Sequence, residues 1–285
     1  MRLVVGINSD IGRAIELYWI ENNVAHHAST RDRQYSNEHR PYIDLTKVIV
    51  LNDRKKYDSA VLCAGITRLA TCRKDPIGTR KINVEGTLKL ARYLSSQGTQ
   101  VIFLSTDKVY DGLCQYRLPE EEVSPVTEYG IQKAEAERGI LELSNGVVLR
   151  VAKVVYPSQE LLAGWVVKLK AGQTITPLYD MWFAPVSMNS VCRMIDRLIT
   201  SRANGIWHIS STHEITYQEA ARHIAKCLGA DPKNIKAGSF RDSGRVLGEE
   251  VPRYTSLDMK KTSKLGIFPE DPIETLHNSI CLPAL

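Results

Sequence analysis

Two side chains able to exchange protons stand four residues apart in the segment SPVTEYGIQKAEAE, residues 124–137. On a helix, Tyr129 and Lys133 would share one face, one turn apart. A free phenol, with a pKa of about 10, is a poor acid or base at neutral pH, but a neighbouring ammonium group favours its ionised form. The pair indicates proton transfer, although a chain with 12 Tyr can carry this spacing by chance.

A glycine-containing turn near the start of the chain indicates a phosphate site. In VVGINSDIGRAI, residues 4–15, a strand, a turn and a helix start follow in the order that aims a helix N-terminus at a pyrophosphate. Gly6 and Gly12 occupy the ends of a GxxGxxG spacing, and Ser9 stands in the middle, where its Cβ limits the approach of a phosphate. The pattern predicts cofactor binding, and an ordinary turn is the alternative.

The second predicted strand, VAHHAST at 24–30, ends without a carboxylate. Dinucleotide domains that use NAD usually carry Asp or Glu there to bind the ribose hydroxyls. Arg31 and Arg33 follow instead, and a guanidinium offers paired charged donors to a 2′-phosphate. The two arginines therefore predict NADPH in preference to NADH, with a solvated basic loop as the alternative.

Short apolar runs alternate with helical patterns through the first half of the chain. The runs lie at 3–7, 24–30, 59–65, 100–106 and 146–152. Strands that are apolar throughout and separated by helices indicate a parallel sheet covered on both faces. The predicted fold class is α/β, a Rossmann-type doubly wound parallel sheet with a smaller C-terminal substrate-binding lobe.

The rhythm changes after Pro157, where the chain becomes rich in turns and aromatic residues. We assign residues 1–156 to an NAD(P)-binding domain, with segments near 186–212 returning to it, and 157–285 mainly to the substrate-binding lobe. Helices are expected at about 188–200 and 216–228, and a strand at 205–211. The last fifty residues show little regular pattern.

Composition excludes several classes of protein. The chain has 285 residues, 43% hydrophobic and 24% charged, which is typical of a globular protein. A net charge of +5 without a basic arm gives no support to nucleic-acid binding. We expect no membrane segment and a cytoplasmic location, because no apolar run approaches ~18 residues and no signal-peptide pattern is present. The six cysteines form no CxxC, and no HExxH occurs, so no metal site is expected.

The segment FLSTDKVYDG, residues 103–112, followed by YGIQKAEAE, resembles the extended short-chain dehydrogenase/reductase superfamily. Within it the chain is most similar to the dTDP-4-dehydrorhamnose reductase-like, or sugar-nucleotide-binding, branch, which carries STDYVFDG at a strand end and YGxxKxxxE on the next helix. INVEGT at 82–87 and VVLRVAKVVYP at 147–157 extend the match. The resemblance implies an NADPH-dependent reductase that acts on the keto group of a nucleotide-activated deoxysugar.

The resemblance also implies roles for individual residues. Thr106 would hydrogen-bond the substrate carbonyl, Tyr129 would donate the proton, and Lys133 would bind the nicotinamide ribose and tune the phenol. The expected cofactor-binding residues are Gly6, Ser9, Asp10, Ile11, Gly12, Arg31, Arg33, Asp44, Leu45, Cys63, Ala64, Gly65, Asn83, Tyr129 and Lys133. The candidate substrate contacts are Lys108, Lys153 and Arg253.

Two other functions remain open at this point. A nucleotide-sugar epimerase or dehydratase uses the same Tyr and Lys, but dehydratases of the superfamily typically have an acidic pair directly after the Thr, and here Lys108 follows Asp107. A non-catalytic cofactor-binding subunit, like the regulatory subunit of methionine adenosyltransferase, is the second alternative. The expected partner is a nucleotide sugar, and a homodimer is compatible with this interpretation.

Overall fold

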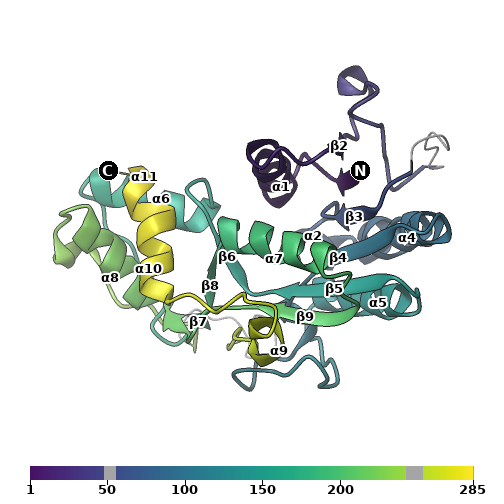
Figure 1. Ribbon diagram of the computed structural model, residues 1–285. Helices are drawn as coiled ribbons and strands as arrows, with labels where there is room; N and C mark the ends of the chain where they lie inside the picture. The colour runs from purple at the N-terminus through teal and green to yellow at the C-terminus, as the bar shows by residue number, and fades with distance from the viewer. Residues whose placement is uncertain (48–55, 242–252, 285) are drawn as a thin grey trace. The chain divides into compact units, whose positions relative to one another are not determined.

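The computed structural model describes residues 1–47, 56–241 and 253–284 (Figure 1). The chain divides into two compact units. Unit 1 contains Met1–Val109, Val123–Arg150 and Cys192–Trp207, and unit 2 contains Tyr110–Glu122, Val151–Val191 and His208–Leu285. The assignment of cofactor binding and substrate binding to separate parts of the chain stays a prediction.

Unit 1 is built around a six-stranded sheet with the order β2-β1-β3-β4-β5-β9. Its strands are β1 (Arg2–Val5), β2 (His26–Ser29), β3 (Ser59–Leu62), β4 (Gln100–Thr106), β5 (Gly146–Val151) and β9 (Gly205–Ile209). β1 pairs in parallel with β2 and with β3, and β3 pairs in parallel with β4. The predicted Rossmann-type fold class is confirmed.

The strand order reverses at β1. The chain passes from β1 to β2 on one side and then returns to β3 on the other side. The carboxyl ends of β1 and β3 are in register at Val5 and Leu62. In open α/β sheets a ligand binds where the strand order reverses, outside the carboxyl ends of the strands.

Helices cover the sheet because its strands are apolar on both faces. Leu3, Ala60 and Phe103 belong to a core cluster shared with Leu90 and Ile140 of the helices. The intervening strand positions Val4, Val61 and Ile102 are fully buried as well. The helical elements of this part are α1 (Asp10–Glu21), α2 (Leu69–Lys74), α3 (Pro76–Arg80), a π-helical turn (Lys81–Gly86), α4 (Thr87–Ser96), α5 (Glu128–Leu141) and the short 3₁₀ turns Arg33–Tyr35 and Asp107–Val109.

Helix α5 is held against the sheet by a buried ion pair. The guanidinium of Arg150 on β5 donates to both carboxylate oxygens of Glu137, with Nη2 2.7 Å from Oε2 and Nε 3.1 Å from Oε1. Each residue is only 2% exposed. Because neither charge can reach water, the position of α5 along β5 is fixed by this contact.

Unit 2 has two short strand pairs with helices around them. β6 (Lys153–Val155) runs parallel to β8 (Pro185–Ser187), and β7 (Trp182–Phe183) runs antiparallel to β10 (Ile215–Thr216). The helical elements are α6 (Glu160–Lys170), α7 (Met188–Thr200, whose C-terminal part belongs to unit 1), α8 (Tyr217–Cys227), a 3₁₀ turn (Pro232–Asn234), α9 (Lys260–Ser263), α10 (Pro272–Leu276), a π-helical turn (His277–Cys281) and α11 (Leu282–Ala284).

The helices expected at 188–200 and 216–228, and the strand expected near 205–211, are confirmed. The expectation of little regular structure in the last fifty residues is wrong for 272–284. Asp271 starts this helical segment by accepting hydrogen bonds from the backbone N–H groups of Ile273 and Glu274, and Pro272 suits the first turn. Leu276 and Ile280 then pack into the core of unit 2, and this packing rather than local propensity supports the helix.

In the described part of the chain, no helix combines the length and the apolar character needed to cross a membrane.

The buried ion pair predicts a specific stability pattern. Arg150→Met should lower the free energy of unfolding by about 3–5 kcal/mol, because it leaves the Glu137 carboxylate buried and uncompensated. The double variant Arg150→Met, Glu137→Leu should recover much of that loss. Urea unfolding measures both, and Arg138→Met on the exposed side of α5 is the matched control. Additive losses in the double variant would contradict the pairing.

Candidate active site

The turn after β1 requires glycine at two positions. Gly6 has φ +100°, and a Cβ there would lie 2.7 Å from the backbone nitrogen of Ala64. A Cβ on Gly12 would lie 2.3 Å from the carbonyl oxygen of Gly6. The backbones of the turn, of the first turn of α1 and of the segment after β3 are therefore packed too closely for any side chain.

Ser9 is the N-cap of α1. Its hydroxyl donates to the carbonyl oxygen of Gly6 at 2.8 Å and accepts from the backbone N–H of Gly12 at 3.0 Å. These two bonds give a physical reason for a serine in the middle of the glycine pattern, because the side chain satisfies polar groups within the turn. The hydroxyl is thus engaged with the backbone.

A cavity of about 520 Å³ opens at the carboxyl ends of β1, β2 and β3. Its lining includes these residues expected from the sequence: Gly6, Ser9, Asp10, Arg31, Asp44, Leu45, Cys63, Ala64 and Gly65. The other expected residues, Ile11, Gly12, Arg33, Asn83, Tyr129 and Lys133, do not line it. Sequence reasoning missed the lining residues Asn8, Ser29, Ile43, Thr46, Ile66, Thr67 and Ile82. These residues could have been predicted, because they lie directly after strand ends or beside residues that were expected to line the site.

The two arginines after β2 lie in different environments. Arg31 is exposed, lines the cavity, and makes no hydrogen bond or ion pair with any residue in the described part of the chain. Arg33 stacks on Tyr42, with its guanidinium carbon 4.6 Å from the ring centroid. Of these two arginines, Arg31 is therefore the one that offers a cation to a ligand in this cavity.

Asp44 is an anion held by its neighbours. Partial burial favours the neutral acid, but hydrogen bonds from Thr46, Lys47 and Tyr42 outweigh it and lower the pKa of Asp44 to about 2. The closest donors are the Thr46 hydroxyl at 2.7 Å and the Thr46 backbone N–H at 3.0 Å. The carboxylate is therefore charged at neutral pH at the edge of the cavity.

Tyr129 and Lys133 lie on the first turns of α5, whose N-cap is Thr127. Both are buried, at 8% and 7% exposure. Lys133 Nζ donates to the carbonyl oxygen of Leu104 on β4 at 2.6 Å, and it lies 4.1 Å from the ring centroid of Phe103 and 5.9 Å from that of Tyr129. The helix spacing places both groups beside the strand that ends in Thr106.

Burial sets the protonation of this pair. It raises the pKa of Tyr129 well above its usual value, and the nearby Asp107 adds to the shift. Burial also lowers the pKa of Lys133 to about 8. The pKa of Tyr129 therefore moves in the direction opposite to the shift toward the ionised form that was expected beside Lys133. The phenol is protonated at neutral pH, as a proton donor must be.

Thr106, Asp107 and Lys108 form a hydrogen-bonded chain after β4. The Thr106 hydroxyl donates to Asp107 Oδ1 at 2.9 Å and accepts from the Lys108 backbone N–H at 3.3 Å. Lys108 Nζ lies 3.1 Å from Asp107 Oδ2. The ammonium group of Lys108 therefore neutralises a buried carboxylate next to Tyr129.

A buried amide pair fixes the backbone behind this site. Asn83 lies in the π-helical turn, accepts from the backbone N–H of Ile66 at 2.7 Å, and donates to the carbonyl oxygen of Ile66 at 2.9 Å and to Gln132 Oε1 at 2.8 Å. Gln132 is fully buried on α5 between Tyr129 and Lys133. Sequence reasoning missed Gln132, although its place inside the YGxxK pattern was a signal.

The other candidate substrate contacts lie in unit 2. Lys153 is half-buried at the start of β6. Arg253 is exposed, and its guanidinium carbon lies 4.6 Å from the ring centroid of Trp182 and 5.4 Å from that of Tyr254. Such a stack combines a cation with a flat aromatic surface.

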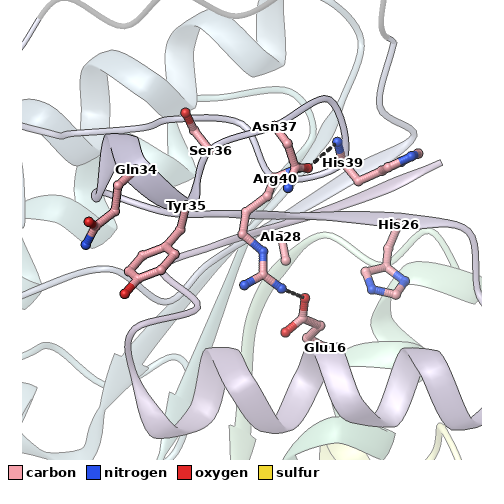
Figure 2. A pocket seen from close by; sticks show the side chains of 9 residues that line it. All are labelled: Glu16, His26, Ala28, Gln34, Tyr35, Ser36, Asn37, His39 and Arg40. Carbon is pink, nitrogen blue, oxygen red and sulfur yellow. Dashed lines mark hydrogen bonds and ion pairs between the residues drawn. The ribbon is translucent and has the colours of Figure 1, made fainter.

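A second cavity, of about 510 Å³, lies between α1 and the loop after β2 (Figure 2). Figure 2 shows the Arg40 guanidinium pointing toward Glu16, with Nη2 2.9 Å from Oε1, and Asn37 bonded to the backbone N–H of His39. These polar groups satisfy one another. The cavity contains none of the residues expected to perform chemistry.

The parallel sheet, the glycine turn at its switch point and the buried Tyr and Lys on the helix after the Thr106 strand define an extended short-chain dehydrogenase/reductase. The RmlD substrate binding domain family matches residues 1–280, and the chain belongs to this family.

Individual relatives agree with this family. A dTDP-4-keto-6-deoxy-D-glucose reductase of Streptomyces niveus is 28% identical over 231 residues, which cover 79% of each chain. Methionine adenosyltransferase 2 subunit beta of Pongo abelii is 27% identical over 95% of this chain and 84% of its own. The crystal structure of dTDP-4-dehydrorhamnose reductase from Bacillus anthracis in complex with NADP has a TM-score of 0.85 at 18% identity and covers 98% of this chain and 97% of its own. At this low identity, the similarity to the Bacillus anthracis structure shows that the two proteins share a fold.

The lowered pKa of Lys133 predicts a pH-dependent stability. The unfolded chain keeps this proton up to a pKa of about 10.4, whereas the folded protein loses it near 8, so the unfolded state binds more protons in between and stability rises with pH. The free energy of unfolding should increase by about 2 kcal/mol between about pH 8 and about pH 9.5, relative to Lys133→Met. Denaturant unfolding of the cofactor-free protein measures this difference, and identical slopes for both proteins would refute it.

Proposed function

We propose that this protein is an NADPH-dependent reductase of the keto group of a nucleotide-activated deoxysugar. The observation that carries the proposal is the buried, protonated Tyr129 beside Lys133 on α5, next to the strand that ends in Thr106. The reductase name of the Streptomyces niveus relative and the NADP bound by the Bacillus anthracis protein support the same reaction and cofactor.

The cavity at the switch point fits a dinucleotide. The close approach at Gly6 and Gly12 packs the turn after β1 against the start of α1, where Ser9 caps the Gly12 N–H, and a helix N-terminus favours an anion. The Asp10 carboxylate would repel a phosphate, so we assign the contribution of Asp10 to its backbone N–H. Arg31 would hold the 2′-phosphate, and Asp44 with Leu45 would face the adenine.

The protein's own groups handle the proton and the developing charge. NADPH, when bound, supplies the hydride that reduces the carbonyl carbon. Tyr129 donates its phenolic proton to the carbonyl oxygen as negative charge forms there. The Thr106 hydroxyl, which donates to Asp107 Oδ1 in this structure, would turn to donate a hydrogen bond to the same carbonyl oxygen. Lys133, close to Tyr129, would hydrogen-bond the nicotinamide ribose.

For the substrate we propose contacts from Lys108, Lys153 and Arg253. Arg253 on Trp182 offers a guanidinium for a diphosphate beside a ring face for a base or sugar. Lys108 already pairs with Asp107, so its contact with substrate would be shared with that carboxylate. All side chains proposed for the reaction belong to a single chain. The homodimer stays a prediction.

The alternatives fit the site less well. Dehydratases of the superfamily typically have a second acid after the Thr, and here that position holds Lys108, whose ammonium group pairs with Asp107. A purely regulatory subunit, as the similarity to methionine adenosyltransferase 2 subunit beta suggests, would not need the proton donor. Tyr129, Lys133 and Thr106 are all present here, which favours an enzyme.

Replacement of the proton donor tests the proposal. Tyr129→Phe should keep folding and NADPH affinity but lower kcat by about 10²- to 10⁴-fold, because the variant lacks only the acidic oxygen. NADPH oxidation with a 4-keto-6-deoxy nucleotide sugar is the assay, and Tyr179→Phe, at an exposed tyrosine, is the control. Full turnover in Tyr129→Phe would remove the catalytic role of this residue.

The different environments of the two arginines predict that only one of them contributes to NADPH affinity. Arg31→Ala should weaken NADPH binding by roughly tenfold to a hundredfold, the loss of one charge-assisted hydrogen-bonded contact, and leave NADH binding unchanged. Arg33→Ala should change NADPH binding little, because Arg33 stacks on Tyr42. Isothermal titration of the wild type and of both variants with each cofactor measures these affinities. Tighter binding of NADH than of NADPH by the wild type would overturn the predicted preference.

A further inference from the structure

Four side chains with metal-binding atoms meet in unit 2, and none of them lines either cavity described above. His223 and Cys227 lie on α8, and His277 and Cys281 lie on the π-helical turn that follows α10 (Figure 1). One ligand atom from each residue lies within 4.8 Å of the other three. Patterns such as CxxC and HExxH do not detect this group, because Cys227 and His277 are 50 residues apart.

The spacing within each segment repeats. Both segments read His-x-x-x-Cys, and residues four apart on a helix share a face. α8 and the C-terminal helical segment therefore each present one imidazole and one thiol to the same point. The second pair sits in a π-helical turn, a rare wide turn that is frequent at functional sites.

Two of the separations match those of a tetrahedral zinc site. With Zn–S of about 2.3 Å and Zn–N of about 2.0–2.1 Å, neighbouring ligand atoms lie about 3.3–3.8 Å apart. The Cys227 sulfur lies 3.5 Å from His223 Nε2 and 3.5 Å from His277 Nδ1. All four ligand atoms lie within 4.8 Å of one another, so small shifts of the side chains would bring them onto one ion.

We propose that His223, Cys227, His277 and Cys281 bind one Zn²⁺ ion as a closed tetrahedral site. Two thiolates with two imidazoles are a ligand set that selects zinc, and four protein ligands leave no open position for catalysis. The site is therefore structural.

A single ion fits better than an iron–sulfur cluster with the same ligand types. In a Rieske-type cluster both histidines bind one iron and both cysteines bind the other, which separates nitrogens from sulfurs across the cluster. Here the Cys227 sulfur contacts a nitrogen of each histidine. This mixed contact places all four atoms around one centre.

The position of the site indicates what the ion does. Cys281 is 1% exposed and packs with Leu276 and Ile280 in the core of unit 2, whereas both histidines are half-buried and give an ion a route from solvent. Zinc would join α8 to the end of the C-terminal helical segment. It would stabilise the folded state of unit 2 because the unfolded chain has no such site.

Metal analysis of the tag-free wild-type protein tests this inference independently of reductase activity. The protein is stripped with a chelator, reconstituted with Zn²⁺ under reducing conditions and desalted. We expect about one zinc per chain. Titration with Co²⁺ should give thiolate-to-cobalt charge-transfer absorption and the intense visible bands of a four-coordinate ion. Less than about 0.2 zinc per chain, with no charge-transfer absorption, would overturn the proposal.

Variants assign the ligands. The double variant Cys227→Ser, Cys281→Ser should lose zinc and the charge-transfer absorption, while Cys114→Ser, at an exposed cysteine outside the group, should keep both. Chelation should lower the Tm of the wild type by at least about 3 °C and leave that of the double variant unchanged. Equal zinc loss in Cys114→Ser, or a Cys227–Cys281 disulfide in the isolated protein, would contradict the site. If the double variant does not fold, the cobalt spectrum of the wild type decides.

Discussion

The position of α5 depends on charges buried at its contact with the sheet. Arg150 and Glu137 form a two-point ion pair that is almost completely shielded from water, and one turn earlier Lys133 donates to the carbonyl oxygen of Leu104. A buried charge without its partner costs several kcal/mol, so α5 has little freedom to shift along β4 and β5. The side chain of Tyr129 is placed by the same contacts, one further turn toward the helix N-terminus.

The same burial that fixes α5 also sets its chemistry. Removal of water keeps the Tyr129 phenol protonated and brings the Lys133 ammonium closer to neutrality, which is the opposite of what the two residues would do on an exposed helix. Asp107 adds to the shift of Tyr129, and Lys108 compensates its charge. The raised pKa keeps the proton on Tyr129 at neutral pH but makes the phenol a weaker acid, so transfer of the proton depends on the negative charge that forms on the carbonyl oxygen.

The sequence was sufficient for the features that depend on local pattern. The apolar runs predicted where the strands lie, and therefore also where β1 and β3 end. Other features depend on contacts between distant segments, which no pattern encodes: the role of Ser9 in capping α1, the stacking of Arg33 on Tyr42, and the bond between Asn83 and Gln132. The helical segment at 272–284 was missed because its apolar residues pack on α8.

Transfer of labelled hydride tests the central claim most directly. Incubation of the protein with NADPH that carries deuterium at both positions of the reactive nicotinamide carbon, together with a 4-keto-6-deoxy nucleotide sugar, should give a product with one deuterium on the former carbonyl carbon, visible by NMR. Unlabelled product, or no product across a broad panel of keto sugars despite tight NADPH binding, would contradict a reductase built around Tyr129.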